Sequence, residues 1–142
     1  MTSIGAVKDA LVTLLTAALP YTQVIVGPAD VTTLKNRTLV VGGESTPMEL
    51  RLTNFDGSSS DAIYTLTITV SVSLPGTDES KAEDMAVADF NAAVAAIQAD
   101  QALGLDANFS ATVTGAGELL ESSSASGRSA AVRFPVVIYT TL

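Results

Sequence analysis

The chain has 142 residues and a net charge of −8, and 47% of its residues are hydrophobic whereas only 15% are charged. This size predicts one domain, residues 1–142, with its own hydrophobic core, and the scattered basic side chains argue against a surface for binding nucleic acid. No apolar run approaches the roughly 18 residues needed to cross a bilayer, so the many hydrophobic residues favour an oligomer that buries surface between its subunits.

The first predicted element is a helix over Ser3–Leu19, in which apolar residues recur at three- and four-residue spacing. Ser3 is a suitable N-cap, and Pro20 ends the helix because proline cannot donate a backbone hydrogen bond. The next predicted elements are three short strands, at Tyr21–Val26, Thr38–Val41 and Glu49–Thr53. They are followed by Asn54–Asp61, whose glycine, aspartates and serines predict a flexible turn.

The most regular stretch is Ala62–Leu74, in which apolar and hydroxyl side chains alternate. Tyr64 and Ile68 fall on the side that we expect to be buried, and Thr65 and Thr69 fall on the other. A period of two in β-branched and aromatic residues predicts a strand with one buried and one solvent-facing side. A strand of this length spans the whole domain or projects beyond it.

The second helix is predicted at Asp78–Leu103, where many alanines suit close packing on a sheet, and Gly104 is a natural stop. Short strand pairing is predicted at Phe109–Val113 and can continue at Leu119-Leu120. The segment Glu121–Arg128 predicts a polar loop that is mobile in an isolated subunit. A second long strand is predicted at Ser129–Leu142, and Pro135 inside it indicates an edge position or a bulge.

This order of elements predicts the fold class. A helix, three short strands, a long strand, a second helix and further strands are typical of an α+β fold. We therefore expect a mostly antiparallel sheet with two helices packed on one face. No internal repeat is visible in the sequence.

No set of residues has the pattern of known catalytic chemistry. The sequence contains no histidine and no cysteine, so the usual general base and thiolate nucleophile are missing. An acidic group, Asp78, Glu79, Glu83 and Asp84, has the ligand type that Ca²⁺ or Mg²⁺ prefers. A solvated helix start that complements the helix dipole explains the same residues more simply. We therefore predict no catalytic residue, no metal site and no cofactor.

The layout of the chain resembles the tail terminator proteins of long-tailed phages, the lambda-like minor tail protein U family, and neighbouring tail-completion families. The residues that carry the resemblance are the opening helix ended by Pro20, the polar loop Asn54–Asp61, the long strand Ala62–Leu74, the alanine-rich helix after Pro75-Gly76 and the closing strand with Arg133–Tyr139. It covers nearly the whole chain and includes no diagnostic short motif.

The resemblance implies a structural virion protein and not an enzyme. Such a protein forms a homo-oligomeric ring, a hexamer, that caps the tail tube protein and joins it to the head-tail connector or a head-closure protein. It is assembled in the host cytoplasm and resides in the virion, at the junction of head and tail. DNA passes through the lumen of such a ring without specific binding, and no membrane takes part.

Two other functions fit the same features. One is a tail tube or head-closure (adaptor) protein, and the other is an unrelated oligomeric binding module whose sheet edge accepts a peptide strand. For Arg133, pairing with an acidic neighbour and contact with another subunit are both open. The candidate residues for contact with a subunit or a partner are Asp56, Gly57, Ser58, Ser59, Ser60, Ser123, Ser124, Ser126, Arg128 and Arg133.

Overall fold

The computed structural model describes residues 4–27, 36–42, 50–55, 60–75, 79–105, 109–113, 117–124 and 127–141. These residues form two helices and a mixed, mostly antiparallel sheet, so the predicted α+β class is confirmed. In chain order the elements are α1 (Ile4–Ala18), β1 (Gln23–Gly27), β2 (Arg37–Gly42), β3 (Leu50–Phe55), β4 (Ser60–Pro75), α2 (Glu79–Ala99), β5 (Ser110–Val113), β6 (Glu118–Ser124) and β7 (Gly127–Thr141).

Two long strands form the centre of the sheet. β4 and β7 pair antiparallel over their whole length, from Asp61 opposite Thr141 to Pro75 opposite Gly127. Each has two short strands along its outer side: β3 and β2 on β4, and β5 and β6 on β7. One end of the sheet therefore has the order β3-β4-β7-β5, and the other end has the order β1-β2-β4-β7-β6. The pair β1 and β2 is parallel, which makes the sheet mixed.

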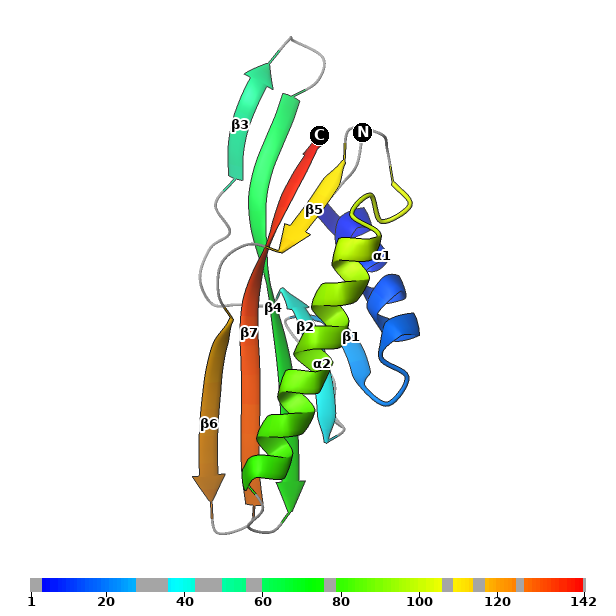
Figure 1. The fold of residues 1–142 in the computed structure, drawn as a ribbon. Helices are drawn as coiled ribbons and strands as arrows, with labels where there is room; N and C mark the ends of the chain where they lie inside the picture. The colour runs from blue at the N-terminus through cyan, green and yellow to red at the C-terminus, as the bar shows by residue number, and fades with distance from the viewer. Residues whose placement is uncertain are drawn as a thin grey trace.

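Both helices lie on one face of the sheet (Figure 1), as the sequence predicted. The side of β4 that faces them is buried, and its residues alternate along the strand: Tyr64, Leu66, Ile68, Val70 and Val72. β7 adds a matching row, Val132, Phe134, Val136 and Ile138. Burying each such side chain contributes about 1.5–3 kcal/mol, so the alternation along Ala62–Leu74 determines which face of the sheet forms the core.

The helices reach this core through stripes at helical spacing. α1 buries Val7, Leu11 and Leu15, each four residues from the last. α2 buries mainly alanines, Ala82, Ala86 and Ala93 together with Ile97, and small side chains let its backbone approach the long strands closely. Phe90 of α2 packs edge to face against Phe134 of β7, with ring centroids 5.1 Å apart. Aromatic pairs prefer this geometry, and it stabilises the contact beyond the area that is buried.

The second helix ends earlier than its apolar pattern predicts. α2 stops at Ala99, and the chain turns through Leu103 and Gly104, whose φ angles are 52° and 69°. A left-handed glycine after a helix is expected, but Leu103 also adopts this conformation and is still buried. Burial of Leu103 after the turn explains why the sequence pattern seemed to extend the helix.

The prediction of a polar loop at Glu121–Arg128 is wrong. Glu121 to Ser124 belong to β6, and β7 begins at Gly127, where the two strands form a hairpin. Serine-rich composition indicated a loop, but backbone pairing with a long neighbouring strand outweighs the low intrinsic preference of serine for strands. Only residues 125 and 126 lie between the strands, outside the described residues.

Pro135 was predicted to mark an edge position or a bulge at that point of the strand. β7 as a whole is central in the sheet, but the prediction is confirmed at Pro135 itself. The physical reason behind the prediction holds locally. β6 pairs with β7 as far as Arg133, and β5 pairs from Val136 onward. Among the described residues, Pro135 therefore sits opposite the gap between two short strands, where a proline disturbs the ladder least.

Candidate assembly surface

The two predicted contact segments lie at opposite ends of the molecule. Ser60 is the first residue of β4 and pairs with Phe55, at the end of the sheet where β7 finishes. Ser123 and Ser124 lie in β6 beside the start of β7, at the other end. Arg128 also lies at that end, opposite Leu74 of β4. Asp56, Gly57, Ser58, Ser59 and Ser126 lie outside the described residues. The structure therefore separates the candidates into two sets, along a ladder of the order of 50 Å.

Arg133 lies on the sheet face opposite the helices. Its guanidinium group donates a hydrogen bond to Glu118 Oε2 at 2.9 Å, across the β6–β7 pair. The Arg133 side chain is 43% exposed and that of Glu118 is 65% exposed. An ion pair this exposed contributes at most about 1 kcal/mol. Pairing with an acidic neighbour is therefore present, and it leaves the guanidinium accessible.

β6 is an edge strand with two exposed leucines. Leu119 pairs with Val132 and Leu120 with Ala131, so the two side chains point to opposite faces of the sheet. Leu119 is 47% exposed and Leu120 is 45% exposed. Soluble proteins usually protect an edge strand with lysine, proline or a bulge. β6 contains no lysine, proline or bulge, but Glu118 and Glu121 place negative charge on it. Because it still exposes an apolar side chain on each face, it has features of a strand that pairs with another strand.

The sheet face opposite the helices is the second candidate surface. No described helix contacts it, and it carries Thr65, Thr67, Thr69 and Ser71 of β4. β7 adds Arg133, Val137 and Tyr139, of which Tyr139 is 36% exposed. This face is rich in hydroxyl groups. It suits contact with a polar partner or with water more than it suits an apolar core.

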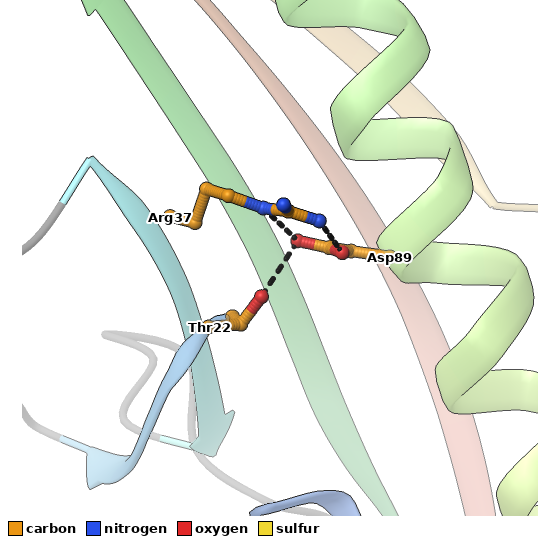
Figure 2. Close-up of polar contacts among 3 residues, drawn as sticks. All are labelled: Thr22, Arg37 and Asp89. Carbon is orange, nitrogen blue, oxygen red and sulfur yellow. Dashed lines mark hydrogen bonds and ion pairs between the residues drawn. The ribbon is translucent and has the colours of Figure 1, made fainter. Parts of the chain in front are cut away.

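A buried polar cluster joins three elements beneath the helical layer (Figure 2). The Asp89 carboxylate of α2 is nearly inaccessible and accepts hydrogen bonds from both Nε and Nη2 of Arg37 at the start of β2. Thr22 Oγ1, just before β1, donates a further bond of 2.9 Å to Asp89 Oδ2. Two-pronged arginine–carboxylate pairing satisfies a buried charge in a fixed geometry. The cluster therefore fastens α2 to β2 and to the α1–β1 turn, and it is a structural device.

Sequence reasoning missed both the buried cluster and the exposed leucines, although each left a signal. Asp89 lies three residues after Ala86 and four before Ala93, on the buried stripe of α2. An acidic residue on such a stripe requires a buried cationic partner. Leu119 and Leu120 are adjacent in a strand, so one of the two must point away from any covered face.

No protein-family model matches the chain, and no curated protein is significantly similar to it. Within the described ranges, acidic side chains do not gather in groups of three that suit a metal ion. In the same part of the chain, neither helix combines the length and hydropathy that a membrane span requires. The first candidate surface, β6, is therefore defined only by its backbone edge and its exposed apolar side chains.

Proposed function

We propose that this chain is a structural virion protein, a tail terminator whose copies form a closed ring of six subunits. The ring caps the tail tube and joins it to the head-tail connector. The observation that carries the proposal is β6, an edge strand without lysine, proline or a bulge, with Leu119 and Leu120 exposed on its two faces. Each subunit of a ring needs two complementary surfaces, and an open strand edge can supply one of them.

The length of the molecule supports contacts with two different structures, one at each end of the sheet. The hairpin of β3 and β4 extends beyond the helices at one end of the sheet, and the β6–β7 hairpin lies at the other (Figure 1). A subunit that joins two structures along a common axis needs one contact region at each end. We assign one end to the tail tube and the other to the head-tail connector.

The charge of the chain supports passage of DNA without binding. Each subunit carries a net charge of −8, so a ring of six repels a DNA phosphate backbone wherever its acidic groups face the lumen. DNA entering such a ring is not retained. The seven basic side chains are too few and too scattered to reverse this.

The test is the size distribution of the purified chain. In mass photometry, a terminator gives one discrete species of about 87 kDa, six times the 14.5 kDa subunit, and electron microscopy shows a ring with a central opening. The species keeps its size as the protein concentration rises. Open-ended polymers that lengthen with concentration indicate a tail tube protein instead. A monomer or dimer over the whole concentration range indicates a binding module and contradicts the proposal.

A further inference from the structure

We propose that β6 of one subunit pairs antiparallel with β1 of the next, so that one sheet continues around the ring. The inference rests on the proposed self-assembly and identifies the two edges that meet. Both strands are outermost in the same half of the sheet, which has the order β1-β2-β4-β7-β6. A copy placed beside another in the same orientation therefore brings β6 of the first next to β1 of the second.

Strand polarity permits this contact. β1 is parallel to β2, β2 is antiparallel to β4, and β4 is antiparallel to β7. β6 is antiparallel to β7, so it runs opposite to β1. Two copies in the same orientation therefore form an antiparallel pair, the arrangement that outnumbers parallel pairing in known sheets.

The rows of residues across the sheet also match. Val24 of β1 pairs with Leu39, Leu39 with Val70, Val70 with Val132, and Val132 with Leu119 of β6. This row lies on the helix side, and its three inner members are buried. Leu119 ends it at 47% exposure, and Val24 begins it half-buried. In the ring, Leu119 of one subunit meets Val24 of the next, and the apolar row becomes continuous.

Exposed apolar side chains concentrate at these two edges. Among the residues whose side-chain burial is described, which leaves out β3, six large hydrophobic side chains are exposed: Tyr21, Val26, Val87, Leu119, Leu120 and Tyr139. Tyr21 and Val26 flank or belong to β1, and Leu119 and Leu120 belong to β6. Four of the six thus lie at the edges that the proposal joins. This distribution favours a second copy over a partner of different chemistry, because the apolar side chains exposed at one edge can cover those exposed at the other.

Cysteine cross-linking tests the pairing, since the natural chain contains no cysteine. The test uses Val26→Cys and Leu119→Cys, which are diagonal neighbours, about 8 Å apart, if the rows continue between subunits. A short bis-maleimide is added to each single variant and to their mixture. We expect a cross-linked dimer from the mixture only. The double variant should give a ladder of products on a denaturing gel that ends at the ring size.

Other outcomes overturn the pairing. If the Leu119→Cys variant forms a cross-linked dimer when no other variant is present, two β6 strands meet around a twofold axis. Rings that form normally but yield no cross-link in the mixture place the interface elsewhere, while the proposed function stands. A wild-type chain that never forms rings contradicts both proposals. Ala95→Cys on α2, which is exposed on the side of the helix opposite its buried stripe, is the control that should stay monomeric on the gel.

A lysine at the edge gives an independent readout. Leu120→Lys places a charge on an exposed position of β6, where natural edge strands use lysine to prevent pairing. We expect at least a tenfold rise in the concentration at which half of the chains are in rings, with unchanged circular dichroism. Ala95→Lys, on the exposed side of α2, should leave that concentration unchanged. Equal behaviour of the two variants would remove β6 from the interface.

Discussion

Asp89 is a charged residue buried beneath the helices. It is 2% exposed, and its partners Arg37 and Thr22 come from two other parts of the chain. Removing Asp89 leaves the Arg37 guanidinium, which is 25% exposed, without its partner. Because water reaches part of this group, the cost is about 3 kcal/mol, the lower end of the range for buried pairs. We therefore predict that Asp89→Ala lowers the free energy of unfolding by this amount, as measured by urea denaturation.

Glu118→Ala is the matched control for Asp89→Ala. It also removes a carboxylate from an arginine, but the Glu118 side chain is 65% exposed, so the expected loss is below about 1 kcal/mol. Replacing Arg37 and Asp89 together by methionine and leucine should restore most of the stability, because no charge is then left buried. Equal losses in Asp89→Ala and Glu118→Ala would show that the Asp89 pair is hydrated.

Tyr64 is a second buried polar residue, and its hydroxyl has no hydrogen-bond partner. Burial raises the pKa of Tyr64 from 10.0 to about 12. Because the folded state disfavours the phenolate, the stability from the neutral form is fully present below pH 10 and is lost as the pH rises toward 12. We predict a loss of roughly 2 kcal/mol at pH 12 from this residue.

Tyr64→Phe isolates this effect. The variant keeps the ring and removes the unpartnered hydroxyl, so at pH 7 it should be as stable as the wild type or about 1 kcal/mol more stable. Between pH 10 and 12 its stability should fall less than that of the wild type, in chemical denaturation at each pH. Parallel decreases of the two proteins would mean that the Tyr64 hydroxyl reaches water.

Among the helices and strands, periodicity in the sequence was sufficient to predict those that a local pattern determines. It was not sufficient for those that depend on contacts with distant residues. The alternation along Ala62–Leu74 correctly predicted both β4 and its buried face, since neighbouring residues in a strand point to opposite sides. The end of α2 and the β6 strand were mispredicted, because their states depend on distant contacts. Leu103 is buried after the helix has ended, and serine-rich β6 is held as a strand by β7.

The two faces of β4 yield a prediction at the same scale. Ile68 is fully buried opposite Phe134, whereas Thr69 lies on the uncovered face opposite Arg133. Ile68→Asp places an unpaired charge in the core and should abolish folding. Thr69→Asp places the same charge beside an arginine and should change stability by no more than about 1 kcal/mol. Circular dichroism and thermal melting of the two variants compare them directly, and a folded Ile68→Asp would reverse the assignment of faces.

For the whole molecule, the sequence supplied candidate contact residues but not their positions relative to one another. Serine-rich segments around Ser60 and Ser123 were candidates, and the fold places them at opposite ends of the sheet. The edge formed by Leu119 and Leu120 could not be recognised, because an edge exists only once the strand order is known. Strand order depends on pairing between residues far apart in the chain, which local patterns do not encode.

The balance of charge and apolar surface leads to a prediction for assembly. Subunits with a net charge of −8 repel one another, and at 10 mM salt this repulsion extends about 30 Å, against about 8 Å at 150 mM. The proposed contact between Leu119 of one subunit and Val24 of the next is apolar, so salt does not screen it. We therefore expect rings to form at lower protein concentration in 150 mM than in 10 mM sodium chloride, as measured by mass photometry.

A Glu118→Gln/Arg133→Gln variant should respond to salt in the same way, because that exposed pair lies within one subunit. Rings that dissociate as salt is added would instead show that ion pairs between subunits hold the interface, and that the apolar edges do not.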